Sequence, residues 1–216
     1  AHEFTHSWDG KFRRPADLWT ANLNVPMRNS LLWMYEGGTE YWGLVLAARA
    51  GFWSPAQSLD VWAALIASLH NRPGRTWRNI QDTTSDEIIN PRRPMSWPSW
   101  ERFEDYYGEG ALIWLDADTL IRERSHEQRS LDDFARQFFG IENGRSTPVV
   151  YTFDDIVRAL NNVEAYDWAT FLHSRLTGRD TPLPLASLQR SGYRLVFTDT
   201  PGEYWKAAEA EAPGAY

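Results

Sequence analysis

The sequence of 216 residues contains no cysteine, which excludes disulfide bonds, thiolate catalysis and any metal site with cysteine ligands. It also lacks an apolar run approaching the roughly 18 residues that a membrane-spanning helix needs, so we expect no membrane insertion. Positive charge is scarce as well, since 22 basic residues stand against 29 acidic ones and give a net charge of −7. This balance makes a nucleic-acid phosphate backbone an unsuitable partner.

Aromatic residues, in contrast, are abundant. The chain has 12 tryptophans, and 14% of its residues are aromatic. This content predicts a dense core or an aromatic-lined cleft, and the composition alone does not separate the two. The remaining composition is that of an ordinary globular protein, and the length corresponds to between one and two domains.

The spacing of the apolar residues predicts a mainly α-helical fold. We expect helices over residues 31–50, 55–70, 101–124, 130–139, 152–161, 167–176 and 185–190, after a helical turn over 1–9. Ser54, Ser130 and Thr152 stand where N-cap residues are expected. Residues 10–29 and 79–98 are predicted to be connecting loops and residues 193–198 (YRLVFT) a strand. The small, polar residues of the tail AAEAEAPGAY indicate a linker or a frayed end.

The first six residues contain an H-E-x-x-H motif formed by His2, Glu3 and His6. On a helix, positions i and i+4 share one face and lie about one turn, ~5.4 Å, apart. Both imidazoles can therefore reach one Zn²⁺ at about 2.0–2.1 Å. Glu3 lies beside them, where it can take a proton from a water molecule on the metal. The alternative is a helix face on which these side chains make only surface contacts.

A catalytic zinc site has three protein ligands and one open position. Phe12 stands where a third histidine of the extended motif would fall, so we expect a downstream carboxylate. Glu36 is the best candidate, because a buried carboxylate in a tryptophan-rich apolar helix is costly without a cation. Glu40 lies one turn further along. It could be a ligand, support a ligand or bind the amino group of a substrate, and a solvated residue without such a role is an equal alternative.

Several segments together resemble the glycyl aminopeptidase family of bacterial metallopeptidases. They are residues 2–11 (HEFTHSWDGK), 14–15 (RP), 32–39 (LWMYEGGT), 73–75 (PGR), 97–100 (WPSW), 104–110 (EDYYGEG), 115–122 and 129–133 (RSLDD). The twenty-nine residues between His6 and Glu36 also match the spacing of this family. The resemblance covers nearly the whole chain and implies the helical lobe of a thermolysin-like, or gluzincin, catalytic domain.

The resemblance implies a role for each matching residue. His2, His6 and Glu36 would bind a single Zn²⁺, and Glu3 would act as the general base. Tyr107 corresponds to the tyrosine that donates a hydrogen bond to the developing oxyanion. A phenol suits this task because it donates without carrying charge. The alternative for Tyr107 is an aromatic core residue.

Other polar residues receive less specific expectations. Asp118 stands where the family has an acid, which could contact a zinc histidine or form a surface salt bridge. Arg14 is a candidate for binding a substrate carboxylate, as are its neighbour Arg13 and the pair at 92–93. Such arginines are more often solvated or in salt bridges. The isolated histidines are expected at the surface or in capping positions, and they are His70, His126 and His173.

The resemblance implies a zinc-dependent aminopeptidase that releases N-terminal glycine or alanine from a peptide substrate. An endopeptidase with the same zinc site and a non-catalytic peptide-binding or assembly module are the alternatives. Family members carry an upstream β-rich region and a PDZ domain. We therefore expect residues 1–200 to form the catalytic lobe and residues 201–216 a linker, with both other regions absent here and the lobe alone weakly active or inactive. Exported family members favour the periplasm or cell envelope over the cytoplasm, while the sequence itself leaves the compartment open.

Overall fold

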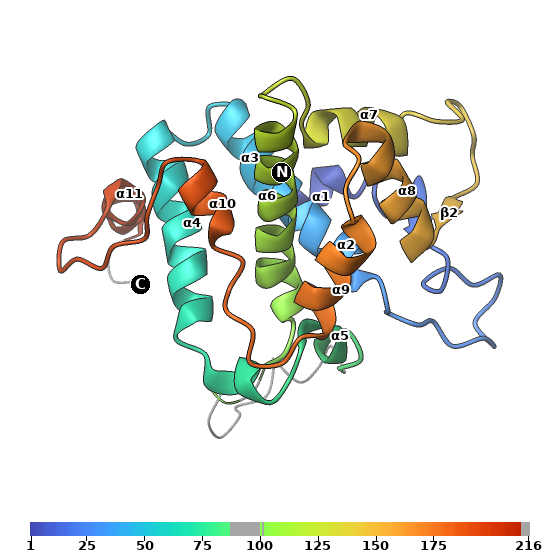
Figure 1. Ribbon diagram of the computed structural model, residues 1–216, viewed down its shortest axis with the longest axis horizontal. Coiled ribbons are helices and arrows are strands. Elements are labelled where there is room, and N and C mark those ends of the chain that lie inside the picture. Colours follow the sequence, from blue (N-terminus) through green and yellow to red (C-terminus); the bar gives the residue numbers. More distant parts are fainter. Residues whose placement is uncertain (87–99, 101, 213–216) are drawn as a thin grey trace.

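The computed structural model describes residues 1–86, 100 and 102–212. These residues are mainly α-helical, as predicted from the sequence (Figure 1). In chain order the elements are α1 (His2–Thr5), β1 (Arg13–Pro15), α2 (Leu32–Tyr35), α3 (Gly37–Arg49), α4 (Pro55–His70), η1 (Pro73–Thr76), α5 (Ile80–Thr83), α6 (Asp105–Arg124), α7 (Leu131–Phe139), β2 (Val149–Tyr151), α8 (Phe153–Val163), α9 (Trp168–Thr177), α10 (Ala186–Arg190) and α11 (Glu203–Glu211).

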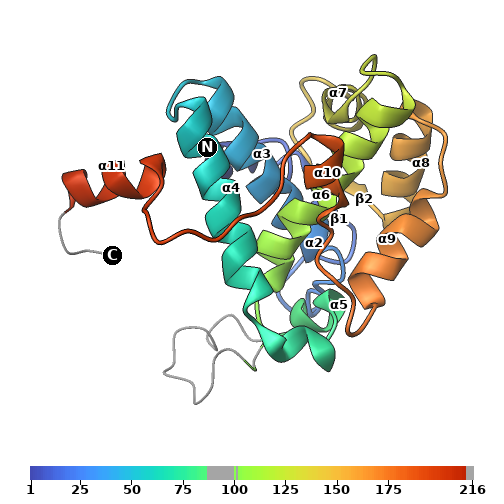
Figure 2. The same ribbon diagram turned by 60° about the vertical axis from the view of Figure 1, so that its left-hand side comes forward.

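Helix α6 runs through the middle of the molecule, where it contacts α2, α3, α4, α5, α7 and α10 (Figures 1 and 2). Consecutive residues 111–114 of α6 are all buried, as expected for a helix that is covered on every side. Glycines allow the closest of these contacts. A Cβ atom on Gly37 of α3 would lie 2.8 Å from the Cα atom of Gly110 in α6, so any larger residue would push the two helices apart.

Part of the tryptophan content forms the core. The rings of Trp33 and Trp114 stack with their centroids 5.9 Å apart, and the Trp114 Nε1–H donates a 3.3 Å hydrogen bond to the Trp33 carbonyl. Trp168 is also fully buried. Other tryptophans, among them Trp8 and Trp19, are exposed. The aromatic residues therefore form a dense core, and a remainder lies at the surface.

Side-chain caps fix where several helices begin. Ser54, Ser130 and Thr152 each form a capping box with the residue three positions further on, and these caps were predicted from the sequence. Each box satisfies backbone N–H groups that would otherwise lack partners in the first turn. Helices α4, α7 and α8 therefore start where the sequence indicates.

The loops and helix boundaries differ from the prediction in several places. The helix expected over 31–50 is divided at Glu36 into α2 and α3. Helix α6 begins at Asp105 rather than 101, because Glu104 has a left-handed backbone conformation with φ 56°. The loop predicted over 10–29 contains β1, which pairs in parallel with β2. The loop predicted over 79–98 contains α5, and its residues 87–98 lie outside the described residues.

The strand predicted over residues 193–198 is wrong. Among the described residues this segment has no strand partner, and Phe197 is 68% exposed. A β-favouring composition does not make a strand where no sheet edge is available to it. The segment instead runs along α4, where Leu195 and Val196 line a cavity together with Ala63.

The tail is helical over Glu203–Glu211 and not frayed there, while its role as a linker stays a prediction. Alanine and glutamate are strong helix formers, and the Asp60 carboxylate of α4 accepts a 3.0 Å hydrogen bond from the Tyr204 N–H in the first turn. Figure 2 shows α11 beside α4, on the side away from α8 and α9. Residues 213–216 lie outside the described residues. Among the residues described, no helix has the length and apolarity needed to cross a membrane.

Candidate metal centre

Helix α1 is only four residues long, and it depends on packing against α3 for its stability. Gly43 of α3 makes this contact close. A Cβ atom on Gly43 would lie 3.1 Å from the Cα atom of His2, so the absence of a side chain lets the α1 backbone rest on α3. This packing places the residues of the H-E-x-x-H motif beside Glu36, at the junction between α2 and α3.

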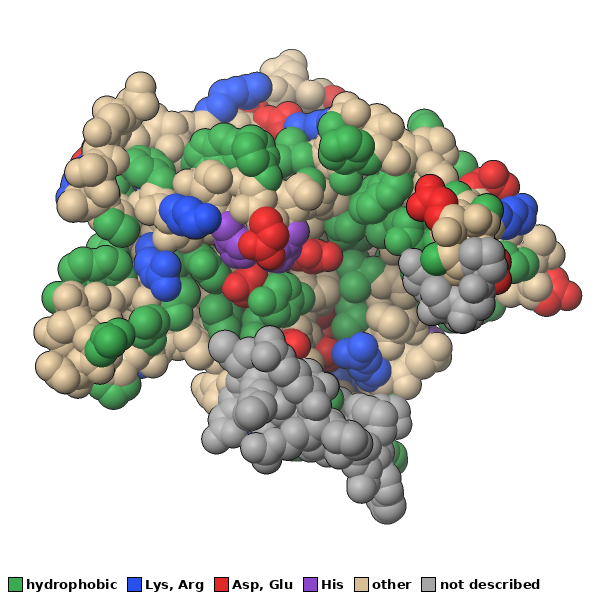
Figure 3. Space-filling view, turned by 180° about the vertical axis from the view of Figure 1, so that it is seen from behind, with side chains coloured by type: hydrophobic (Ala, Val, Ile, Leu, Met, Phe, Trp, Pro, Cys, Tyr) green, Lys and Arg blue, Asp and Glu red, His purple; other side chains and the backbone are tan. Residues whose placement is uncertain are grey.

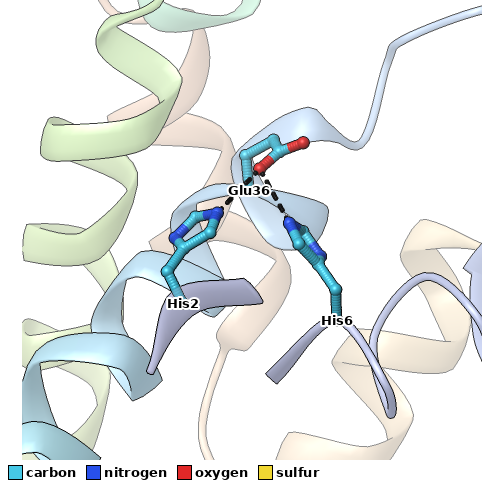
Figure 4. A group of neighbouring side chains, drawn as sticks. All are labelled: His2, His6 and Glu36. Atoms are coloured by element: carbon cyan, nitrogen blue, oxygen red, sulfur yellow. Dashed lines mark ion pairs between the residues drawn. The ribbon is translucent and has the colours of Figure 1, made fainter. Parts of the chain in front are cut away.

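His2, His6 and Glu36 converge on one point (Figure 4). The Nε2 atoms of the two histidines each lie 3.3 Å from the Oε2 atom of Glu36. One nitrogen or oxygen atom from each of the three residues lies within 4.8 Å of the other two. The structure therefore brings together the three residues that the sequence proposed as metal ligands.

The second nitrogen of each ring is already engaged. His2 Nδ1 lies 2.8 Å from Glu40 Oε2, and His6 Nδ1 lies 2.9 Å from the backbone carbonyl oxygen of Asp9. In the neutral form of each ring, which is the form that binds a metal ion, a carboxylate or carbonyl acceptor holds the proton on Nδ1 and leaves the lone pair of Nε2 free. Both Nε2 atoms face Glu36. This is how proteins orient histidine ligands toward a metal ion.

The charges of the three residues are coupled. Burial would raise the pKa of Glu36, but the contacts with His2 and His6 outweigh it and lower the pKa to about 2. Contact with Glu36, and then with Glu40, raises the pKa of His2 to about 9. Burial lowers the pKa of His6, while Glu36 and the Asp9 carbonyl raise it above its ordinary value. The carboxylate therefore carries a full negative charge at neutral pH and attracts a cation.

The residues fit a zinc ion. Glu36 Oε2 is buried, and its two 3.3 Å contacts are ion pairs without hydrogen-bond geometry, so this oxygen has no hydrogen-bond donor among the described residues. A buried carboxylate oxygen without a donor is costly unless a cation faces it. Two imidazole nitrogens and one carboxylate oxygen are the ligand set of a hydrolytic zinc site.

Tyr107, in the first turn of α6, lies next to these residues. Its ring centroid is 5.9 Å from that of His2. Burial, followed by the negative charge of Glu36, raises the pKa of Tyr107 far above its ordinary value. The hydroxyl group therefore keeps its proton at neutral pH and can donate a hydrogen bond. The neighbouring Tyr106 is buried in the core.

The other two predicted site residues lie at the edge of this group. Glu3 is exposed on α1, between the two histidines in sequence. The Arg14 Nε–H donates a 3.1 Å hydrogen bond to the Leu18 carbonyl, and the guanidinium lies 5.8 Å from the ring centroid of Tyr35. Tyr35 in turn stacks on the His6 ring, with centroids 4.9 Å apart. Tyr35 therefore contacts both Arg14 and the candidate ligand His6.

The remaining expectations have mixed outcomes. Asp118 contacts neither histidine of the motif and accepts hydrogen bonds from Arg122 Nε (2.8 Å) and the Leu131 N–H (2.7 Å). It therefore forms a salt bridge with Arg122, as the alternative prediction had it, but the Asp118 side chain is buried and not at the surface. The isolated histidines at 70, 126 and 173 are exposed, as expected. The arginine pair at 92–93 and residues 97–99 of the WPSW segment lie outside the described residues.

Sequence reasoning missed three residues that hold the motif in place. Tyr35 stacks on His6, Asp9 provides the carbonyl that contacts His6, and the Tyr151 hydroxyl donates a 2.8 Å hydrogen bond to the Asp9 carboxylate. Tyr35 and Asp9 are close to Glu36 and His6 in the sequence, and this proximity could have indicated them. Tyr151 is 142 residues away from Asp9, and no local pattern points to it.

The site opens on one face of the molecule. Figure 3 shows histidine and acidic side chains together near the centre of this face, with basic and hydrophobic side chains around them. A cavity of about 350 Å³ adjoins Tyr107 and is lined by Leu65, Leu69 and Phe103 among others. The cavity is of mixed polarity, because Ser68, Arg72, Glu104 and Asp105 line it as well.

Comparison with known proteins adds an independent finding. A model of the M61 glycyl aminopeptidase family matches residues 1–113, which is just over half of the 216 residues and includes every candidate site residue named above apart from Asp118 and Tyr151. No curated protein matches the chain.

The fold is also found in a solved structure, the crystal structure of an aminopeptidase N family protein from Idiomarina loihiensis. The TM-score is 0.72 and the sequence identity 22%, and the match covers 87% of this chain. The chain spans only 32% of the length of that protein. The structural likeness thus supports the helical fold, and the family match supplies the relationship: the chain belongs to the M61 glycyl aminopeptidase family.

Proposed function

We propose that this chain is the helical lobe of a zinc-dependent peptidase, and that the enzyme is an aminopeptidase releasing N-terminal glycine or alanine. One observation carries the proposal. His2, His6 and Glu36 converge through Nε2, Nε2 and Oε2, while both Nδ1 atoms are held by other acceptors. Membership of the M61 glycyl aminopeptidase family supports peptide hydrolysis and the preference for a small N-terminal residue.

In the proposed reaction, His2, His6 and Glu36 hold one zinc ion. When bound, zinc supplies Lewis acidity, which polarises a carbonyl group and makes water a stronger nucleophile. The Glu3 carboxylate takes a proton from the attacking water and delivers it to the nitrogen of the leaving amine. The Tyr107 hydroxyl donates a hydrogen bond to the carbonyl oxygen as negative charge develops there. Its raised pKa keeps this donor protonated.

The geometry favours a supporting role for Glu40. Its Oε2 atom is engaged with His2 Nδ1 at 2.8 Å, so binding a substrate amino group would compete with this contact. We therefore assign Glu40 to the orientation of His2, and the preference for a free amino terminus rests on the family relationship. Arg14 remains a candidate for a substrate carboxylate, because it stands beside Tyr35 at the edge of the site.

We further propose that the lobe works together with other regions of the same polypeptide, such as an upstream region and a PDZ domain. This proposal is consistent with a chain that spans 32% of the length of the aminopeptidase N family protein. The bacterial periplasm or cell envelope remains the predicted location.

The test is hydrolysis of glycyl and alanyl fluorogenic amides and of their N-acetylated counterparts. Both the 216-residue chain and any longer native polypeptide containing it are assayed, before chelation, after chelation and after zinc is restored. We expect free amides to be cleaved faster than acetylated ones, with activity lost on chelation and regained with zinc. Rapid cleavage of acetylated substrates would favour the endopeptidase. Activity that survives Glu3→Gln would rule out the proposed mechanism, and a protein without stoichiometric zinc would favour a non-catalytic module.

A further inference from the structure

The two motif histidines are supported in different ways. His2 Nδ1 contacts a side chain, the Glu40 carboxylate, whereas His6 Nδ1 contacts the backbone carbonyl of Asp9. A backbone carbonyl points in the direction that the surrounding peptide units set. The orientation of the His6 ring therefore depends on whatever fixes the backbone at Asp9.

The peptide unit that carries the Asp9 carbonyl is held on its other side by the Gly10 N–H, which donates a hydrogen bond to the Arg13 carbonyl. Asp9 itself is fixed at two further points. Its backbone N–H donates a 3.1 Å hydrogen bond to the Thr5 carbonyl, which continues the turn of α1. Its carboxyl side chain is only 2% exposed, so burial raises its pKa well above the ordinary value, and it accepts a 2.8 Å hydrogen bond from the Tyr151 hydroxyl. A rotation of the Asp9 peptide unit that turned its carbonyl away from His6 would strain or break this buried contact, which costs about 1–3 kcal/mol when a partner is left unsatisfied.

Tyr151 is itself a rigid anchor. It is fully buried at the end of β2, and its ring packs against the Phe138 ring with the two centroids 5.1 Å apart. Its backbone carbonyl accepts a 2.8 Å hydrogen bond from the Ala16 N–H, next to the register pair of Tyr151 with Pro15. Both the side chain and the main chain of Tyr151 therefore hold the segment that follows α1.

The His6 ring is also held by a stacking contact on one of its faces. Tyr35 stacks on it with an interplanar angle of 28°. Gly10, with φ 129°, allows this arrangement, because a Cβ atom there would lie 2.7 Å from the Tyr35 ring. Tyr35 thus restricts the tilt of the His6 ring, while rotation within the ring plane depends on the hydrogen bond to Asp9.

We propose that Tyr151 is a positioning residue for the metal centre, which acts through Asp9 on the orientation of the His6 ring. This inference rests on the proposed zinc function and adds a contribution from the second half of the chain, outside residues 1–113 that the family model matches. Tyr151 touches neither metal nor substrate. Substitutions of residues that orient metal ligands typically lower metal affinity by about 10–100-fold. Because Tyr151 acts one contact further away, we expect the lower end, about tenfold.

The test uses Tyr151→Phe, which removes only the hydroxyl group. The matched control is Tyr41→Phe, because Tyr41 is also a buried tyrosine near an aspartate, Asp118, and lies where α3 packs against α6. Affinities for Zn²⁺ and Co²⁺ are measured by competition with a chromophoric chelator. The visible spectrum of bound Co²⁺ reports the ligand geometry, and urea unfolding of the metal-free proteins reports the stability.

We expect Tyr151→Phe to bind both ions about tenfold more weakly and to shift the Co²⁺ spectrum, while Tyr41→Phe keeps the wild-type affinity and spectrum despite a comparable loss of stability. Asp9→Asn retains an oxygen that accepts the Tyr151 hydrogen bond, so it should stay close to the wild type, whereas Asp9→Ala should behave like Tyr151→Phe. If Tyr151→Phe does not fold, the Asp9 pair provides the same comparison.

Wild-type affinity and spectrum in both Tyr151→Phe and Asp9→Ala would overturn the inference and leave these residues with a purely structural role. A wild-type chain that binds neither Zn²⁺ nor Co²⁺ would overturn the proposed function as well. The two failures are distinguished because the wild-type protein is measured in the same titration.

Discussion

The Oε2 atom of Glu40 lies 2.8 Å from Nδ1 of His2, one helical turn along α3 from Glu36. The two glutamates therefore contact the two nitrogens of the same ring, since Glu36 Oε2 lies 3.3 Å from His2 Nε2. One carboxylate orients the ring and the other completes the set of candidate ligands. The structure thus gives the two acids different roles, and substitutions can separate them.

For Glu40→Ala we expect zinc binding to weaken by about 10–100-fold while the stoichiometry remains one ion per chain. The His2 ring loses the acceptor that fixes its orientation, but all three ligand atoms remain. Competition titrations and metal analysis at saturating zinc measure the two quantities. Glu123→Ala, at an exposed position of α6, is the control and should bind zinc like the wild type.

For Glu36→Gln we expect a larger loss, more than about 100-fold, because a ligand is removed and not only its support. The protein should contain no zinc after dialysis against metal-free buffer. The amide leaves the overall volume unchanged, so the far-ultraviolet circular dichroism spectrum should remain that of the wild type. Stoichiometric zinc in a folded Glu36→Gln variant would exclude Glu36 as a ligand.

Replacing Glu3 with glutamine should separate catalysis from metal binding. A general base contributes about 10²–10⁴-fold to the rate, and the amide cannot accept the proton. We expect hydrolysis of glycyl amides to fall by that factor in kcat with zinc affinity within about twofold of the wild type. The assay uses the longest native polypeptide that is active. A fall in zinc content that accounts for the lost activity would argue against the base role.

The stability of the zinc-free protein and its affinity for zinc should change with pH in opposite directions. In the zinc-free protein the pKa of His2 is raised from its ordinary 6.5 to about 9. The charged ring therefore stabilises the fold fully below pH 6.5, and this contribution is lost as the pH rises through 9. We expect Tm to fall across this window without zinc. Zinc binds the neutral ring, so zinc affinity should rise over the same range. His126→Gln, at an exposed histidine, should leave both slopes unchanged.

Two adjacent glycines of α3 should respond differently to alanine. A Cβ atom on Gly37 would meet the Tyr106 carbonyl oxygen at 2.5 Å, and this backbone atom in α6 cannot move aside. On Gly38 it would meet the side chains of Trp114 and Met34 at 3.3 and 3.4 Å. We expect Gly37→Ala to destabilise the fold by about 1–3 kcal/mol or more. Gly38→Ala should be nearly neutral, because a helix propensity gain of about 1 kcal/mol offsets small shifts of those side chains. Urea unfolding measures both.

The candidate ligands could be predicted because their information is local. The spacing of His2 and His6 places them on one helix face, and Glu36 is conspicuous as an acid among tryptophans. The helix caps at Ser54, Ser130 and Thr152 are also local, since each involves residues three positions apart.

Contacts between distant segments could not be predicted. Nothing in the segment VVY indicates that it pairs with residues 13–15 or that Tyr151 contacts Asp9. The segment YRLVFT has the composition of a strand, but a strand forms only where a partner edge exists, and the part of the chain that the structure describes offers it none. The helices on either side of the break at Glu36, α2 and α3, likewise both pack against α6, which is far away in the sequence.

The pairing of β1 with β2 also has a consequence for biosynthesis. Asp9 and Tyr151 are 142 residues apart, and at about 5–20 residues per second a ribosome needs roughly 7–28 s to synthesise the chain between them. During this time the turn after α1 lacks the strand that secures it, and closing so long a loop has an entropic cost. The histidine motif is therefore synthesised before the strand that secures it, so folding intermediates that lack β2 would bind metal weakly.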